Sequence, residues 1–287
     1  MGRNALIVND LTKMYKDFVL DKVSFQVPCG AIVGLVGENG AGKSTTLNTI
    51  LGIAKKDDGS VQFFDGQSIE NEPGIRAQIG VVLENSSFPD DLSPRKLNSI
   101  FKRIYGTWDE GKFYSYLKKL DLPESKKIKT LSKGMKMKLS IAAAFSHNSK
   151  LLILDEVTSG LDPVIRDDIL DMLLDFVQDE NNSILVSSHI SSDLEKVADY
   201  IVFIHNGKVI FSKPKDELIY HYGIIRCGAA QFDAIDKKDV LAYRKLEYEW
   251  EALVSDKASA QKKYPKAVID AATIDDIMLL YIKGDAQ

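Results

Sequence analysis

The chain has 287 residues, of which 45% are hydrophobic and 27% are charged, and its 37 basic and 41 acidic side chains give a formal net charge of −4. This composition is that of an ordinary globular protein and excludes a largely disordered chain. The slight acidic excess also argues against a nucleic-acid-binding surface, which is usually strongly basic.

No apolar run approaches the roughly 20 residues that a membrane-spanning helix needs, and the first residues carry no secretory signal. The two cysteines, Cys29 and Cys227, lie far apart with no metal-like spacing, and we expect free thiols in a reducing compartment. We therefore expect a cytoplasmic chain, which another chain would have to hold at a membrane.

Strand-like and helical patterns alternate along most of the chain. Apolar runs rich in branched residues predict strands within 5–11, 18–27, 31–36, 60–69, 80–84, 150–156, 183–189 and 200–211. Apolar residues at helical spacing predict helices after residue 43, within 95–127, at 132–146 and at 163–179. Strands that alternate with helices indicate an α/β domain.

The pattern changes near Lys213 and Pro214, where short strand-like runs begin to alternate with short helices. We expect one large domain over 1–215 and a small C-terminal α/β domain over 216–287 that regulates the protein or stabilises a dimer. Its aromatic residues fit either a core or an interface, with the core favoured: Tyr243, Tyr248, Trp250 and Tyr264.

The stretch GENGAGKS at 37–44 matches the pattern of a phosphate-binding loop, and it follows a predicted buried strand and opens a predicted helix. Backbone N–H groups around Gly40 and Gly42 would point at a polyphosphate, aided by the helix dipole. Lys43 would reach the β- and γ-phosphates, and the Ser44 hydroxyl would bind Mg²⁺. The alternative, a glycine turn with an incidental lysine, leaves this context unexplained.

The apolar run LLILDE at 151–156 ends in two carboxylates, Asp155 and Glu156. Asp155 is placed to hold Mg²⁺, and Glu156 to orient and deprotonate a water molecule. His189 ends the next predicted strand, and parallel strands present their carboxyl ends to a common ligand. A strand that ends in solvated acids and a structural histidine are the alternatives.

Taken together and in this order, these motifs resemble the nucleotide-binding subunit of ABC transporters. GENGAGKST at 37–45 looks like Walker A and LLILDE like Walker B. LSKGM at 131–135 looks like the signature, and SGLD at 159–162 like the D-loop. His189 stands where the family has its switch histidine, and Tyr15 where the family stacks an aromatic ring on adenine. The resemblance covers about 4–213 and implies a P-loop NTPase fold, with a RecA-like mixed sheet, an antiparallel β subdomain and a helical subdomain.

The resemblance implies Mg²⁺-dependent ATP hydrolysis by two domains joined head to tail, with ATP and Mg²⁺ as cofactors. Glu156 and His189 would be catalytic, and Asp162 would communicate across the dimer. The signature would reach the partner's ATP through Ser132, Lys133 and Gly134. ATP would contact Tyr15, Gly37, Asn39, Gly40, Gly42, Lys43, Ser44 and Thr45, and the metal would contact Ser44, Glu84 and Asp155.

The sequence departs from the family pattern at two places. Glu84 stands where the family often has glutamine, and a carboxylate binds Mg²⁺ more strongly but adds negative charge near the phosphates. Lys133 and Met135 replace a glycine and a glutamine of the signature, whereas Ser132 and Gly134 are kept.

The resemblance implies the ATPase motor of an exporter for a drug, lipid or peptide. Its partners would be a separate transmembrane permease and a second ATP-binding subunit, identical or not, and no nucleic acid. The chain would lie in the cytoplasm, on the inner face of the membrane through the permease, with the loop at 85–94 receiving the permease. The alternative is a soluble ATPase of the same family that acts on ribosomes or nucleic acid.

Overall fold

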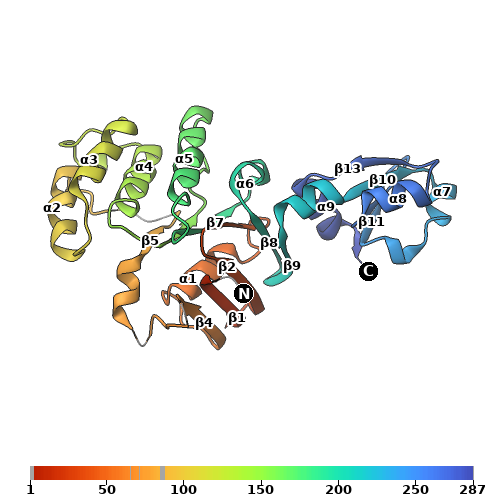
Figure 1. Cartoon of the computed structure of the whole chain (residues 1–287), viewed down its shortest axis with the longest axis horizontal. Coiled ribbons are helices and arrows are strands. Elements are labelled where there is room, and N and C mark those ends of the chain that lie inside the picture. The colour runs from red at the N-terminus through yellow and green to blue at the C-terminus, as the bar shows by residue number, and fades with distance from the viewer. Residues whose placement is uncertain (1–2, 65, 71, 85–87, 287) are drawn as a thin grey trace.

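The structure is a computed structural model that describes residues 3–64, 66–70, 72–84 and 88–286. Its centre is a six-stranded sheet in the order β5-β6-β7-β3-β8-β9 (Figure 1). The strands are β3 (Ile32–Val36), β5 (Ile79–Val82), β6 (Leu151–Asp155), β7 (Ser183–Ser188), β8 (Tyr200–His205) and β9 (Lys208–Pro214). All neighbours run parallel except β8 and β9, which run antiparallel.

The inner strands of this sheet are covered on both faces, which explains their continuous apolar runs. Every residue of β3, β6 and β7 is buried. Helix α1 (Lys43–Ile50) lies on one face, where Leu47 and Ile50 share a core with Ile153 and Leu185 of the sheet. An antiparallel sheet in the order β2-β1-β4 completes this core. Its strands are β1 (Asn4–Met14), β2 (Val19–Pro28) and β4 (Asp58–Phe63).

Helices cover the other face and extend beyond the sheet to one side. Figure 1 shows α2, α3 and α4 grouped at the end of the molecule farthest from the C-terminus. The helices are α2 (Pro94–Ile104), α3 (Glu110–Lys119), α4 (Lys133–Ala144), α5 (Pro163–Phe176) and α6 (Ser191–Val197), with 3₁₀ turns at Pro73–Gln78 and Ile128–Thr130. The predicted mixed sheet, antiparallel β subdomain and helical subdomain are therefore all present, and the predicted fold class is confirmed.

The residues after 215 form a small α/β unit around a sheet in the order β13-β10-β12-β11-β14. Its strands are β10 (Gly223–Cys227), β11 (Ala242–Lys245), β12 (Trp250–Val254), β13 (Val268–Ala271) and β14 (Asp285–Ala286). Its helices are α7 (Ala229–Asp233), α8 (Lys257–Lys263) and α9 (Ile274–Lys283), with short turns at Glu217–His221 and Lys237–Asp239. The alternation of short strands and short helices that the sequence indicated for this unit is present.

The C-terminal unit has two apolar faces. On one, Phe232 of α7 stacks on Trp250 with ring centroids 4.2 Å apart, and Tyr243 lies close by. On the other, α9 buries Ile274, Ile277 and Leu280 in the same apolar cluster as Phe203 and Leu218, so this unit shares its core with the rest of the chain.

The expectation that the four tail aromatics belong to a core is wrong for Tyr248, which is 88% exposed. Tyr248 lies in the connection between β11 and β12, outside both strands. Both cysteines are free, as predicted, with Cys227 buried and Cys29 half-buried.

Candidate functional site

The phosphate loop runs from the end of β3 to the start of α1. Gly40 and Gly42 adopt positive φ angles of 86° and 114°, a region that other residues rarely enter. Gly37 has no room for a side chain, because a Cβ would lie 2.4 Å from the carbonyl oxygen of Ile204. The loop therefore needs glycine for its backbone angles and for its close contact with β8.

Lys43 is 6% exposed, and its ammonium group faces back into the loop. Its Nζ donates to the carbonyl oxygens of Gly37 at 2.7 Å and Glu38 at 3.2 Å. It also lies 3.3 Å from Oε1 of Glu156. A buried charge is stable only when it is paired and hydrogen-bonded, and Lys43 meets both conditions.

Glu156 joins the phosphate loop to His189. Its Oε2 lies 2.6 Å from Nδ1 of His189 and 3.4 Å from the backbone nitrogen of the same residue. Glu156 has a positive φ of 54°, which is uncommon outside glycine and concentrates at functional sites. The Glu156 carboxylate thus bridges the ammonium group of Lys43 and the imidazole of His189.

Asp155 has a different set of contacts from its neighbour. It is 3% exposed, and the hydroxyl group of Ser187 on β7 donates a short hydrogen bond to its Oδ1. The Ser187 hydroxyl also accepts a hydrogen bond from the backbone N–H of Glu156 at 3.2 Å. Ser187 is thus a site residue that the sequence did not indicate, although it aligns with Asp155 in the parallel ladder of β6 and β7.

A cavity of about 420 Å³ opens over the phosphate loop. It brings together nine of the residues predicted from the sequence: Tyr15, Asn39, Gly40, Gly42, Lys43, Ser44, Thr45, Glu84 and Glu156. Two residues that were not predicted, Phe18 and Glu38, also line it. Gly37, Asp155 and His189 adjoin these residues but do not line the cavity.

Aromatic rings form one side of the cavity. Tyr15 is 49% exposed, and the ammonium group of Lys13 lies 5.4 Å from the centroid of its ring. The ring of Phe18 lies against Gly42, because a Cβ added at Gly42 would lie only 2.9 Å from Cζ of Phe18. An exposed ring beside a phosphate loop offers a stacking surface for a planar base.

The oxygen atoms at the site suit a hard divalent cation. Ser44 and Glu84 line the cavity, and Asp155 is buried next to the cavity residue Glu156. No group of three or more His, Cys, Asp or Glu side chains with the geometry to hold a metal ion occurs in the described part of the chain. Mg²⁺ is usually held by one or two protein oxygens together with substrate phosphates, and the donors present fit that mode.

The signature residues lie away from this cavity. Ser132 begins α4, and its hydroxyl group accepts a hydrogen bond from the backbone N–H of Met135 at 3.2 Å. Ser132 and Lys133 are exposed, and Gly134 is half-buried. Asp162, also exposed, caps α5 through the N–H of Ile165. These residues are free to meet another molecule.

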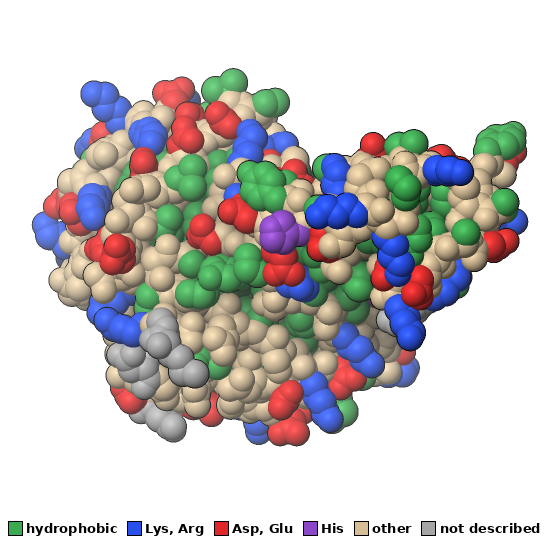
Figure 2. Space-filling view, turned by 45° about the vertical axis from the view of Figure 1, so that its right-hand side comes forward, with side chains coloured by type: hydrophobic (Ala, Val, Ile, Leu, Met, Phe, Trp, Pro, Cys, Tyr) green, Lys and Arg blue, Asp and Glu red, His purple; other side chains and the backbone are tan. Residues whose placement is uncertain are grey.

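Several lysines surround the signature, and neighbouring aspartates partly neutralise their positive charge. Lys136 pairs with Asp90 at 3.1 Å, and Lys129 pairs with Asp91 at 3.0 Å. Hydrogen bonds from Lys129 and Lys127 lower the pKa of Asp91 below its usual value. Figure 2 likewise shows basic and acidic side chains interspersed over one face of the molecule.

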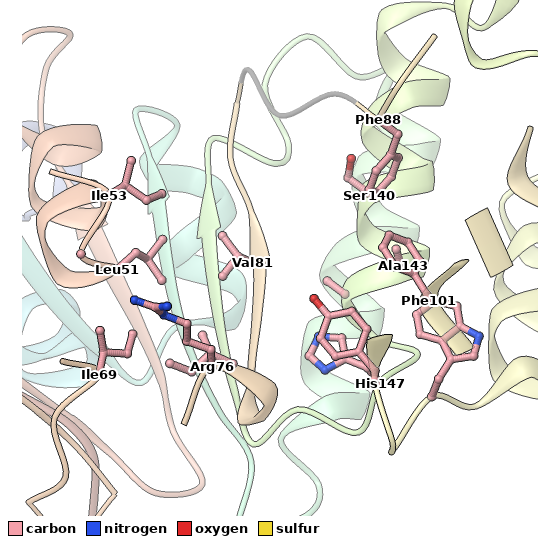
Figure 3. A pocket seen from close by; sticks show the side chains of 15 residues that line it. Leu51, Ile53, Ile69, Arg76, Val81, Phe88, Phe101, Ser140, Ala143 and His147 are labelled. Atoms are coloured by element: carbon pink, nitrogen blue, oxygen red, sulfur yellow. The ribbon is translucent and has the colours of Figure 1, made fainter. Parts of the chain in front are cut away.

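A second cavity, of about 440 Å³, lies between the sheet core and the helical subdomain (Figure 3). Leu51, Ile53 and Ile69 form one wall, and Phe88, Phe101 and Ala143 lie across from them. We call this cavity the apolar groove. Its polar lining residues are Arg76, Ser140 and His147.

His147 is 3% exposed, and its Nδ1 has no hydrogen-bond partner among the described residues. Its ring stacks on Tyr105 with centroids 4.5 Å apart. Burial lowers the pKa of His147 below its usual value of 6.5, although a hydrogen bond with the backbone of Ala77 opposes this shift.

In the described part of the chain, no helix has the length and apolar character to cross a bilayer.

The parallel sheet, the glycine loop that leads into α1 and the grouping of Lys43, Glu156 and His189 define a P-loop NTPase. Comparison with known proteins makes this more specific. Residues 20–159 match the family model described as ABC transporter. The chain belongs to this family, as an ATP-binding subunit whose ATP hydrolysis is coupled to transport, and the recognition made from the sequence is confirmed.

Two relatives and one solved structure illustrate the similarity. The bacitracin transport ATP-binding protein BcrA of Bacillus licheniformis is 36% identical over 73% of this chain and 69% of its own length. The lantibiotic transport ATP-binding protein SrtF of Streptococcus pyogenes is 35% identical over 74% of this chain and 91% of its own length. A solved structure of the ATP-binding subunit of an ABC transporter aligns with a TM-score of 0.68 and 30% identity, over 75% of this chain and 91% of that one.

Proposed function

We propose that this chain is the ATP-hydrolysing motor of an exporter for antibiotics of the bacitracin or lantibiotic kind, acting through a separate permease. The observation that supports this function best is the position of Glu156 between Lys43, at 3.3 Å, and His189, at 2.6 Å. In this proposal Glu156 accepts a proton from the attacking water, and His189 holds the carboxylate in place. Lys43 withdraws from Glu156 to bind the β- and γ-phosphates.

Mg²⁺ in this proposal is held by Ser44, Asp155 and Glu84 together with the nucleotide. The metal would neutralise charge on the β- and γ-phosphates. Ser187 keeps Asp155 oriented through the hydrogen bond to Oδ1. Tyr15 stacks on adenine, while Asn39, Thr45 and the N–H groups of the loop bind the phosphates.

The signature in this proposal acts on the ATP of a second subunit. Ser132, Lys133 and Gly134 sit at the start of α4, where free N–H groups and the positive end of the helix dipole favour an anion. These residues lie outside the cavity of their own chain, which agrees with a role in a head-to-tail dimer, identical or mixed. Asp162 would then lie at the contact between the two subunits.

The apolar groove in this proposal receives a cytoplasmic helix of the permease. Two of the apolar side chains that line the groove are exposed, Ile53 at 64% and Val81 at 37%. The guanidinium of Arg76 lies on one wall and would pair with a carboxylate of the partner (Figure 3). The loop predicted to receive the permease, 85–94, adjoins the groove through Phe88, and its residues 85–87 lie outside the described structure.

The location and the domains follow from the same proposal. The chain would lie in the cytoplasm on the inner face of the membrane, attached through the permease. An ATPase domain over 1–215 would carry the chemistry, and the unit over 216–287 would regulate it or stabilise a dimer. The mixed surface charge gives no support to the alternative of an ATPase acting on ribosomes or nucleic acid.

The experiment that tests this function is purification of the tagged chain from solubilised membranes, with Val81→Arg as the variant and Val268→Arg as the control. Val268 is also exposed, at 63%, but lies in the C-terminal unit. We expect the wild type and Val268→Arg to bring down one membrane protein, and Val81→Arg to lose it, since the added charge would be buried on docking. Equal recovery with both variants, or recovery of ribosomes instead, would contradict the proposal.

A further inference from the structure

Helix α6 follows His189 closely in the sequence. It begins at Ser191, two residues after His189, and is seven residues long. His189 contacts Glu156 through both its ring and its backbone nitrogen. Because both contacts come from the segment that leads into α6, a displacement of this helix would displace His189 from Glu156.

The C-terminal unit holds α6 directly. Glu195 of α6 accepts a hydrogen bond at 2.9 Å from the backbone N–H of Ile274, the first residue of α9. A carboxylate at this end of a helix is also favoured by the helix dipole. Beneath this bond, Leu194 and Val197 of α6 share an apolar cluster with Ile274 and Ile277 of α9. Figure 1 shows α6 on the side of the ATPase core that faces α9.

On its opposite side α6 packs against α5, where Lys196 pairs with Asp167 at 3.0 Å on the surface. Asp193, which is 4% exposed, faces Arg166 of α5 at 3.9 Å, beyond hydrogen-bond length. Neither Asp193 Oδ2 nor Arg166 Nε has a hydrogen-bond partner within the described residues. Arg166 also donates to the carbonyl oxygen of Leu161, next to Asp162. The ion pair of Asp193 with Arg166 is therefore loose, and the hydrogen bond between Ile274 and Glu195 is the shorter of these two contacts.

We propose that the C-terminal unit sets the position of His189 through α6, and that Glu195 is the positioning residue for ATP hydrolysis. This inference rests on the proposed function, because it assigns a regulatory role to the same site. Glu195 does not line the cavity over the phosphate loop. Removal of its carboxylate therefore changes the hydrolytic step and not the affinity for ATP.

The test compares four variants of the full chain by steady-state ATPase assay, ATP binding and thermal melting. Glu195→Ala and Glu195→Asp remove the bond to Ile274, the second because its side chain is one methylene shorter. Glu195→Gln keeps an oxygen acceptor at the same reach. Asp275→Ala is the matched control. Asp275 follows Ile274 in the first turn of α9, and its carboxylate is exposed.

We expect kcat to fall about fivefold or more in Glu195→Ala and Glu195→Asp, the loss of one charge-assisted hydrogen bond, with the KM for ATP unchanged. Glu195→Gln restores most of the activity, and Asp275→Ala keeps all of it. We also expect the pH profile of kcat to change shape in Glu195→Ala, because the contact between His189 and Glu156 changes, whereas a loss of folded protein would lower kcat equally at every pH.

Equal kcat in Glu195→Asp and Glu195→Gln would overturn the proposal, as would a rise in KM without a fall in kcat. If Glu195→Ala does not fold, the comparison of these two variants still decides the question. A wild-type chain without ATPase activity would refute the proposed function itself, and the inference with it. Active wild type with unaffected variants refutes the inference alone.

Discussion

Removal of the Ser187 hydroxyl group tests the geometry beneath the phosphate site. In Ser187→Ala the Asp155 carboxylate loses its donor, and the N–H of Glu156 loses one of two acceptors, keeping only the carbonyl oxygen of Ser187 at 3.2 Å. Both carboxylates are buried, at 3% and 6% exposure. A hydrogen bond to a charged group contributes about 1.5–3 kcal/mol, and 1.4 kcal/mol corresponds to about a tenfold change in rate. We therefore expect kcat to fall at least about tenfold.

The matched control is Ser183→Ala, at the opposite end of the same strand. Ser183 is also fully buried, and its hydroxyl group accepts a neutral hydrogen bond from Gly30 at 3.2 Å. This variant should lose about 0.5–1.5 kcal/mol of stability and keep its kcat. The assay is steady-state ATP hydrolysis with Mg²⁺, with thermal melts of both variants. Equal kcat in Ser187→Ala and Ser183→Ala would refute the role given to Ser187.

Three further predictions follow from the site and its surroundings. Gly37→Ala should abolish tight ATP binding in a nucleotide-binding assay, because its Cβ would lie 2.4 Å from the backbone oxygen of Ile204; unchanged affinity would contradict the account of the loop. Ser132→Arg should abolish ATP-driven dimerisation on gel filtration and leave ATP binding by the monomer intact, whereas loss of monomer binding would mean that the signature serves its own chain. Burial lowers the pKa of His147 in the folded protein below 6.5, so the unfolded chain binds a proton at this residue more readily than the folded protein does. The folded protein therefore loses stability as the pH falls below about 6.5. The melting temperature of the wild type should therefore fall more between pH 7.5 and pH 5.5 than that of His147→Phe, and equal falls would contradict the assignment.

The fold and much of the site could be predicted from the sequence because both depend on local patterns. Buried parallel strands read as continuous apolar runs, and the phosphate loop requires glycine at Gly40 and Gly42 for its positive φ angles. The order of the motifs then placed Lys43 and Glu156 at one edge of a single sheet. These features act over a few residues, so a single sequence displays them.

Other features depend on which segments meet in space, and the sequence does not display them. Ser187 and Asp155 are 32 residues apart and meet only because β6 and β7 are neighbours. Glu195 and Ile274 are 79 residues apart, in units whose contact no motif records. Tyr248 looked like a core residue by type, yet its position in a connection leaves it exposed. Residue type and spacing indicate chemistry, whereas contacts between distant segments require the fold.

The most direct test of the central claim is the rate of ATP hydrolysis by Glu156→Gln at saturating Mg²⁺-ATP. If Glu156 is the general base, its amide replacement cannot accept a proton, and kcat should fall about a hundredfold or more. The variant should still bind ATP and should form the dimer more completely than the wild type, since the bound nucleotide persists. A kcat equal to that of the wild type would contradict the account.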